Sequence, residues 1–504
     1  MSSWLSEREH MLVEGAEKDQ LDLPVPTQIV SNGEYLPPKQ SNLQKKVEKR
    51  IIELADENAK YVGLSRRQFL QTSCGMATAF IAMNEIYGGG VFSASPAEAR
   101  DPELTLARTN SLAGQFIFDD QTHFLRDDFP HDAILGLGEF AAEHWNPKLK
   151  EEGLSLTRYK FENYIAELWY RSDTKMALLS GAPFDDPTWW LLGNDQIVAA
   201  RNMINDFAGT KRMLGHSVIT PGQDGWLDEA ERAIAELKPN SWKSYTIGDP
   251  LSPSKYPWRL DDEKLMYPFY EKSLKAGINT ICIHKGLLPP DYETSFKGIW
   301  KYATVDDVPK AAKDWPEMNF VIYHSALRPF LELPDQAWKE FEESGGYIKW
   351  ASDLARIPEE HGVTNVYGEI GSTFANSAVA HPRFCAAFIG TLVKGLGADH
   401  VVWGTDTVWY GSPQWQIEAM RRLEVPKDMQ KKYNLPALGG PNSLTKQAIF
   451  GLNSARIYGL SMNEANNMPI LPAFSEDKIA GLATQFREAG GGPSNKRFGY
   501  IRKA

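Results

Sequence analysis

The sequence predicts an α/β protein, a (β/α)8 TIM barrel with an N-terminal helical extension. Eight short apolar runs lie between residues 115 and 403, and helical segments separate most of them. Strands that alternate with helices indicate βαβ units and a parallel sheet, and eight such units are typical of a closed barrel. No Gly-x-Gly-x-x-Gly motif follows the first run, which leaves a doubly wound open sheet as the weaker alternative.

The expected elements follow in chain order. Residues 100–470 should form the barrel, and residues 471–504 a C-terminal tail. The clearest helical segments are 195–207, 226–237, 262–275 and 335–343. The eight expected strands are 115–119, 176–179, 213–219, 241–247, 279–283, 319–323, 365–370 and 400–403.

The first 99 residues have a different pattern. Residues 1–42 are polar and interrupted by prolines, so they predict an extended arm. Residues 42–61 carry apolar side chains at three-to-four spacing, which predicts a solvated amphipathic helix. If this segment stays attached, we expect it to pack on the main domain or on a partner subunit.

Within this segment, paired arginines precede an apolar stretch. Arg66 and Arg67 stand before Phe69-Leu70, the apolar run 75–83 follows, and Ala97-Glu98-Ala99 ends the stretch. This resembles a twin-arginine export signal, which implies a periplasmic or extracytoplasmic location if it is used and a cytoplasmic one otherwise. The alternative is a capping box, in which Ser65 and Gln68 open an ordinary helix.

Composition excludes several classes of protein. The 54 Lys and Arg against 65 Asp and Glu give a net charge of −11, whereas a nucleic-acid binder carries a basic footprint. Three cysteines without a Cys-x-x-Cys pair exclude a disulfide framework and a structural zinc site of that type. No apolar run approaches the ~20 residues that span a bilayer, so we expect no transmembrane segment. We expect a small-molecule substrate and a homo-oligomer.

Polar side chains follow the predicted strands at the point where each strand ends. In parallel barrels, catalytic groups lie at this carboxyl edge. Imidazole nitrogens with a carboxylate oxygen suit zinc, iron or manganese, and a barrel mouth can leave one coordination position open for water. A single histidine at such a position is usually a hydrogen-bonded core residue, but several together favour a metal site. The strand-end residues are Asp120 to His123, Lys243, His284, Lys285, His324, Glu369 and Asp406.

On these residues the chain from about 115 to 460 resembles the amidohydrolase superfamily, in its amidohydrolase-related branch, which includes aminocarboxymuconate-semialdehyde and γ-resorcylate decarboxylases. The matching stretches are DDQTHF at the first strand, AGINTICIHKG, WPEMNFVIYHSAL, ADHVVWGTDTVW and the closing GLNSARIYGL. The resemblance implies a TIM barrel with a divalent metal, zinc first and iron or manganese as alternatives. Its ligands would be Gln121, His123, His284 and Asp406.

Gln121 departs from the family, which has histidine at this position. A carboxamide oxygen is a weaker, neutral ligand. Gln121 and His123 are two apart on a strand, so both side chains should face the barrel interior. Three outcomes are open: one metal held by three good ligands with weak help from Gln121, another metal arrangement, or no metal.

The resemblance also implies roles for neighbouring residues. Asp406 would accept a proton from metal-bound water, and His324 would polarise the substrate or donate a proton. Glu369 is a candidate for a carboxylate that hydrogen-bonds and orients one of the histidines. Alternatively, it is simply a carboxylate at the end of a strand. Lys285 and Arg328 could neutralise a substrate carboxylate, and Trp409 could form an aromatic wall, although surface cations and core packing explain such residues equally well.

Three functions follow. The first is a metal-dependent hydrolase acting on a small, possibly aromatic, carboxylate, amide or lactone. The alternative is a non-oxidative decarboxylase of an aromatic or unsaturated acid. The third is a barrel that lost catalysis with Gln121 and binds a ligand or partner.

Overall fold

The computed structural model describes residues 23–31, 40–130, 143, 156–249, 252–288, 291–328, 334–463, 468–469, 474, 476–492 and 501–502. Residues 1–22 and 32–39 of the predicted N-terminal arm, and residues 471–473, 475, 493–500 and 503–504 of the predicted C-terminal tail, lie outside these residues.

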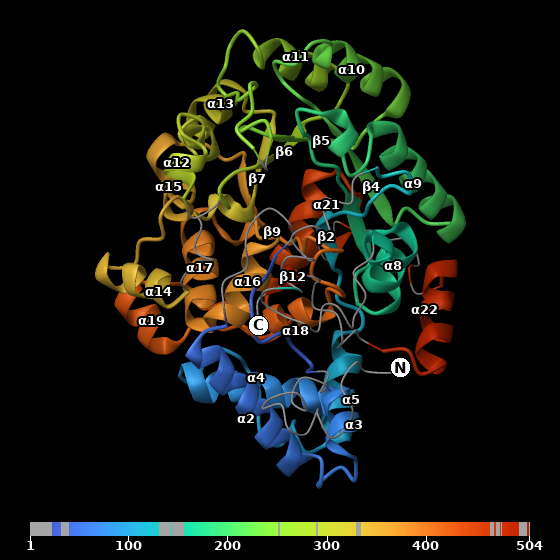
Figure 1. Ribbon diagram of the computed structural model, residues 1–504, viewed down its shortest axis with the longest axis vertical. Helices are drawn as coiled ribbons and strands as arrows, with labels where there is room; N and C mark the ends of the chain where they lie inside the picture. The colour runs from blue at the N-terminus through green and yellow to red at the C-terminus, as the bar shows by residue number, and fades with distance from the viewer. Residues whose placement is uncertain are drawn as a thin grey trace.

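Eight parallel strands form a barrel in sequence order, which confirms the predicted fold class (Figure 1). The first and last strands close it through backbone hydrogen bonds, from Asp120 N to Trp403 O at 2.9 Å and from Asp406 N to Gln121 O at 3.0 Å. The strands are β2 (Phe118–Thr122), β3 (Met176–Leu179), β4 (Met213–Val218), β5 (Ser241–Tyr245), β6 (Thr280–His284), β7 (Asn319–Tyr323), β8 (Val366–Glu369) and β9 (Val401–Val402).

The first strand differs from the prediction. It begins at Phe118 rather than at residue 115, so that Asp119, Asp120, Gln121 and Thr122 belong to the strand itself. Polar residues are disfavoured in an isolated strand. Here they are buried, and the Asp119 carboxylate accepts from the backbone N–H of Thr405 at 2.9 Å. Contacts to the last strand thus override the local preference.

Alternate residues of the strands face opposite sides. Ile281 and Ile283 of β6 pack in the core between strands and helices. Cys282, between them, clusters with Val321 and Val402 inside the barrel. Cys282 therefore lies in the core of the barrel. The next residue on the same face of β6 is His284, whose side chain therefore points toward the mouth of the barrel.

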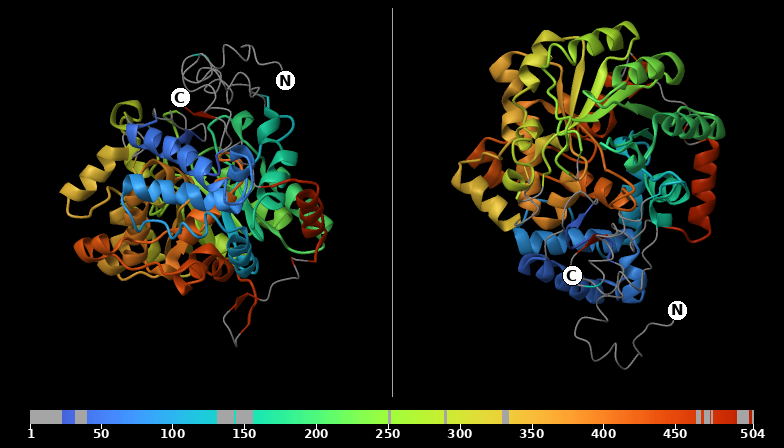
Figure 2. Two further views of the ribbon diagram at one scale, coloured as in Figure 1. Left: turned by 90° about the horizontal axis from the view of Figure 1, so that it is seen from below. Right: turned by 45° about the horizontal axis from the view of Figure 1, so that its top comes forward.

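Helices surround the barrel (Figures 1 and 2). The helix expected over 262–275 begins later, at Tyr267, with Pro268 in its first turn. The main helices around the barrel are α9 (Asn194–Ala208), α10 (Trp226–Arg232), α11 (Tyr267–Lys275), α13 (Val308–Asp314), α14 (Pro334–Glu343), α15 (Ala351–His361), α16 (Thr373–Ala380), α17 (Pro382–Gly395) and α18 (Gln414–Arg422).

The N-terminal segment forms helices that lie against one side of the barrel (Figure 1). The predicted amphipathic helix is α2 (Asn42–Asn58), which buries its apolar face, and it ends three residues before the predicted 61. The paired arginines open α3 (Arg66–Leu70), where the capping box of Ser65 and Gln68 is present. The apolar run lies in α4 (Ser73–Tyr87), and α5 (Pro102–Leu112) follows. Among the described helices, none combines the length and the apolar character needed to cross a membrane.

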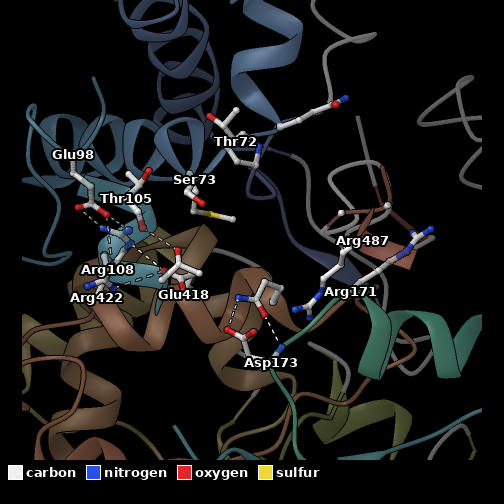
Figure 3. Close-up of a pocket in the computed structure, with 17 residues that line it drawn as sticks. Thr72, Ser73, Glu98, Thr105, Arg108, Arg171, Asp173, Glu418, Arg422 and Arg487 are labelled. Carbon is white, nitrogen blue, oxygen red and sulfur yellow. Dashed lines mark hydrogen bonds and ion pairs between the residues drawn. The ribbon is translucent and has the colours of Figure 1, made fainter. Parts of the chain in front are cut away.

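Buried charges join these helices to the barrel. The Arg422 guanidinium on α18 is 2% exposed and donates to Glu98, which precedes α5, at 2.9 Å. Backbone bonds run beside it, from Ser93 N to Arg422 O at 2.8 Å. A cavity of about 320 Å³ lies in this seam, with Arg108, Arg422, Glu98 and Glu418 gathered on one side (Figure 3). The N-terminal helices therefore share buried polar contacts with the barrel.

Candidate active site

Two side chains from the closing strands meet at the carboxyl end of the barrel. His123 Nε2 lies 3.2 Å from Asp406 Oδ1, and Gln121 Nε2 lies 3.4 Å from the same imidazole nitrogen. All three side chains are buried. Gln121 and His123 therefore point to one place, as their spacing predicts.

The orientation of His123 is set by its other ring nitrogen. Nδ1 lies 2.7 Å from the carbonyl oxygen of Ser180, at the end of β3. A carbonyl can only accept, so Nδ1 carries the proton of this bond. The Nε2 atom is consequently the one presented to Asp406.

Asp406 is held on its far side by Ser372. The Ser372 hydroxyl donates to Asp406 Oδ2 at 2.5 Å and lies 2.8 Å from the hydroxyl of Tyr410. Burial would raise the pKa of Asp406. The hydrogen bond from His123 and the electrostatic effect of His123 outweigh burial and hold that pKa below its usual value. Asp406 is therefore a carboxylate with Oδ1 directed at the imidazole.

Two more imidazoles, those of His284 and His324, meet edge to face near this pair. The ring of His284 lies 4.3 Å from that of Tyr245 and 4.5 Å from that of His324. Burial lowers the pKa of His284 well below its ordinary value and lowers that of His324 to about 4. Both are neutral at pH 7 and can accept a proton or bind an electrophile.

Glu369 fixes the loop that carries His324. Its carboxyl oxygens accept from the backbone N–H of His324 at 3.1 Å and of Gly371 at 2.5 Å, while His324 Nδ1 lies 2.8 Å from Gly371 O. His324 has φ +62°, which side chains rarely adopt, so these bonds hold a strained turn. Burial raises the pKa of Glu369 well above its usual range. A Cβ at Gly404 would collide with the Glu369 carboxyl, so glycine is needed there.

Lys243 supplies a buried positive charge inside the barrel. Its Nζ lies 3.6 Å from the ring centroid of Tyr323 and 5.2 Å from that of Tyr245, and its side chain is fully buried. The charge of Lys243 contributes to the lowered pKa of both His284 and His324, after burial. The site thus combines an ammonium, neutral imidazoles and aromatic rings.

The residues expected to bind a substrate carboxylate are engaged elsewhere. Lys285 Nζ lies 2.8 Å from Asp307 Oδ1 and donates to Tyr302 O at 2.9 Å, with no exposed surface. Arg328 pairs with Glu340 at 2.5 Å on α14. Residues adjacent to a site histidine in sequence point away from it, because successive strand residues face opposite sides.

The ring of Trp409 lies near that of His123. Its ring centroid is 6.4 Å from that of His123 and 5.2 Å from that of Tyr159. Aromatic surfaces therefore border the His123–Asp406 pair.

The side chains that meet at the site include possible ligands for the divalent metal that the sequence predicts. Among the described residues, no group of three or more His, Cys, Asp or Glu side chains is arranged to hold a metal ion. Two buried atoms at the site, Gln121 Oε1 and His284 Nδ1, have no hydrogen-bond partner there. Imidazole, carboxylate and carboxamide groups are ligand types that divalent cations accept, so the chemistry of the set fits a cation with Gln121 as one donor.

Sequence reasoning missed Ser372 and Tyr410. Ser372 comes after the end of β8 and Tyr410 lies four residues past Asp406, so neither ends an apolar run. Ser372 and Asp406 both have positive φ, at +58° and +59°, and no sequence pattern reveals that conformation. A third missed residue is His216 on β4, fully buried, whose ring nitrogens have no hydrogen-bond partner in the part of the chain described.

Comparison with known proteins gave matches of two kinds. Residues 181–460 match the profile of the family described as Amidohydrolase. Among solved structures, an uncharacterised TIM-barrel protein from Bordetella bronchiseptica is 14% identical, covers 68% of this chain and 98% of its own, and has a TM-score of 0.40. A 2,6-dihydroxybenzoate decarboxylase from Rhizobium is 12% identical (68% and 99% covered, TM-score 0.39). A 5-carboxyvanillate decarboxylase from Novosphingobium aromaticivorans, with bound manganese, is 15% identical (69% and 98% covered, TM-score 0.41). The search of curated proteins found no match.

Proposed function

Because this chain belongs to the amidohydrolase family and is an enzyme of that family, we propose that it catalyses the non-oxidative decarboxylation of an aromatic or unsaturated acid at the site around His123 and Asp406. Sequence reasoning placed hydrolysis first and decarboxylation second. The surroundings of Lys243 reverse that order.

The observation that carries the proposal is the buried Lys243 ammonium among aromatic rings. A cation at low dielectric attracts an anionic group strongly, and the rings of Tyr245 and Tyr323 beside it suit a flat apolar body. The imidazoles of His284 and His324 are neutral and add no competing charge. A neutral amide or lactone has no use for this ammonium, whereas an aromatic carboxylate uses both features.

The cation that the family implies would be held by His123, His284, Asp406 and Gln121. When bound, it would supply an electrophilic centre that fixes substrate oxygens. Zinc is the first expectation from the sequence, and iron and manganese are the alternatives.

The chain's own residues would then handle one proton and one carboxyl group. Lys243 would orient the anionic substrate. The bond to the carboxyl carbon breaks and carbon dioxide leaves, while the ring carbon keeps the electron pair and takes a proton. Asp406, a carboxylate in the resting site, would first take a proton from water at Oδ1, since Oδ2 is occupied by Ser372, and would then deliver that proton to the ring carbon. The hydroxide left from that water would be released to solvent. Trp409 and Tyr159 would limit access of bulk water.

Hydrolysis is the second candidate, on a different observation. Asp406 is ionised and directed at the site, so it could also accept a proton from an attacking water.

One experiment separates the two. Purified enzyme, loaded with manganese or zinc, is incubated with a panel of hydroxylated benzoic acids and with matched esters and lactones. We expect carbon dioxide in equal amount to the decarboxylated product, and a KM at least tenfold higher for the acid in Lys243→Met. Turnover of esters or lactones without carbon dioxide release would establish hydrolysis instead.

A further inference from the structure

A chain of buried hydrogen bonds leads from Asp406 to the N-terminal end of the molecule. Ser372 Oγ contacts Asp406 Oδ2 at 2.5 Å and Tyr410 OH at 2.8 Å. Asn376 Nδ2 on α16 donates to Tyr410 OH at 3.3 Å, and Asn376 Oδ1 accepts from the backbone N–H of Val30 at 3.3 Å. All five residues are at most 3% exposed.

The direction of every bond in this chain is determined by chemistry. An ionised carboxylate only accepts, so Ser372 gives its single proton to Asp406. The proton between Ser372 and Tyr410 must then belong to Tyr410. Tyr410 oxygen accepts from the Asn376 amide, and the amide orientation is fixed because the backbone N–H of Val30 can only donate. Bonds that all point the same way polarise one another.

Val30 belongs to a segment that we call the strap, residues 23–31. Val25, Ile29 and Val30 are buried in the main core. The strap ends in β1 (Val30–Ser31), which pairs antiparallel with β12 (Ile501–Arg502) from the other end of the chain. The bond from Val30 N to Asn376 Oδ1 places this strand pair against α16.

We propose that the strap is a working part of the active site, with Val30, Asn376 and Tyr410 acting as positioning residues that orient the Asp406 carboxylate through Ser372. The proposal rests on the proposed role of Asp406 as the proton carrier. Asp406 and Ser372 both have φ near +60°, a conformation that persists only where surrounding contacts over-determine it. The chain of hydrogen bonds through Ser372 supplies those contacts, on the side of Asp406 opposite His123. It follows that the segment before residue 100 is retained in the active enzyme.

The first test separates kcat from KM in the full-length, metal-loaded enzyme. Tyr410→Phe removes the donor to Ser372, and Val30→Pro removes the backbone N–H at the first residue of a strand, where proline is tolerated. Each should lower kcat about tenfold with KM changed less than threefold, because one hydrogen bond in a charge-linked chain is lost. The double variant should lose little more than either single one, since both break the same chain.

The matched control is Tyr87→Phe. Tyr87 is also buried, and its hydroxyl donates to Ala380 O at the end of the same helix, α16, at 2.9 Å, outside the chain. The Tyr87→Phe variant should have a lower melting temperature and an unchanged kcat. An unchanged kcat in folded Tyr410→Phe and Val30→Pro overturns the proposal, as does an equal loss of kcat in Tyr87→Phe.

The second test needs no substrate, so that failure of the proposed reaction remains distinguishable. Hydrogen exchange is followed by mass spectrometry in a peptide covering the strap. We expect slow exchange of the Val30 amide in the wild type and at least tenfold faster exchange in Asn376→Leu, which lacks the acceptor. Fast exchange in the wild type, or no change in the variant, contradicts the strap contact whatever reaction the enzyme performs.

Discussion

His123 Nε2 lies 3.2 Å from Asp406 Oδ1, and this contact joins the first and last strands of the barrel. Backbone bonds close the barrel at the same place, from Asp406 N to Gln121 O at 3.0 Å and from His123 N to Thr407 O at 2.6 Å, so the pair stands at the seam of the closed sheet. Neither side chain is more than 3% exposed. The positions of the two groups are therefore set by closure of the fold itself, which keeps them in register without flexible loops.

Asp406→Asn should abolish most of the activity while leaving the protein folded. The amide retains the size and one acceptor but cannot carry a proton between water and substrate, so kcat should fall about 10²–10⁴-fold. Steady-state kinetics with a melting curve measure both effects. Asp399→Asn, at a carboxylate 63% exposed and paired with His400, is the control and should be neutral. Equal activity in both variants would remove Asp406 from the mechanism.

Gln121→His should slow the release of a bound cation to a chelator. Gln121 lies 3.4 Å from His123 Nε2, so position 121 adjoins any cation that His123 holds. An imidazole binds zinc or iron better than a carboxamide does. Activity need not rise, because a tighter ion can crowd the substrate. Gln121→Leu is the opposite control and should release the cation faster; identical release from all three proteins would place residue 121 outside the coordination sphere.

Lys285→Met should destabilise the fold rather than weaken substrate binding. The Lys285 ammonium and Asp307 form an ion pair with at most 2% exposure, and loss of one partner leaves a buried carboxylate alone. The expected loss in the free energy of unfolding is about 3–5 kcal/mol. The double variant Lys285→Met with Asp307→Leu should recover part of it. Urea denaturation measures the loss; a raised KM at unchanged stability would restore Lys285 to the substrate site.

Glu98→Gln tests how much the ion pair between Glu98 and Arg422 contributes to packing of the N-terminal helices on the barrel. Arg422 would lose a charged partner at a buried position, although Glu418 remains 3.5 Å away. We expect a loss of about 3 kcal/mol in the free energy of unfolding. A chain that begins at Arg100 should be less stable still, since it lacks all of these contacts. If that truncated chain matches the full-length protein in stability and activity, the N-terminal segment is a removable signal, and the mass of the natural protein should then lack residues 1–99.

The sequence predicted the barrel well because its strands are short apolar runs, and β6, β7 and β8 lie where the pattern places them. It missed the true bounds of β2, because a buried carboxylate such as that of Asp119 becomes acceptable in a strand only through tertiary hydrogen bonds. Histidines that follow apolar runs were identifiable in the same way.

The supporting groups were not identifiable. Ser372 has no signature in the sequence, since its role depends on a positive φ and on a loop that approaches Asp406. The sequence placed Lys285 among the substrate-binding residues, whereas in the structure it pairs with Asp307 and the Lys243 side chain faces the barrel interior. Sequence proximity to a histidine counts for less than the face of the strand on which a residue lies.

The pH dependence of stability should contain a contribution from His381, away from the active site. This residue caps α17: its Nδ1 accepts from the backbone N–H of Phe384 at 3.1 Å, and its ring stacks on Trp338 at 5.0 Å. Burial lowers the pKa of His381 to about 4 from an ordinary value of 6.5. Between these values the unfolded chain binds a proton that the folded protein does not, so this contribution to stability is full above pH 6.5 and is lost as the pH falls toward 4.

At pH 5 the loss from His381 alone should be about 2 kcal/mol relative to pH 7.5. His381→Asn keeps a capping acceptor without a titrating group, because asparagine is a favoured residue at helix N-termini. Urea denaturation at both pH values therefore gives a direct comparison. The wild type should lose about 2 kcal/mol more than the variant on acidification, while buried Asp119 and Asp120, whose pKa values burial raises to about 7, change both proteins equally. Identical losses in the two proteins would mean that His381 takes up its proton in the folded state as readily as in the unfolded one.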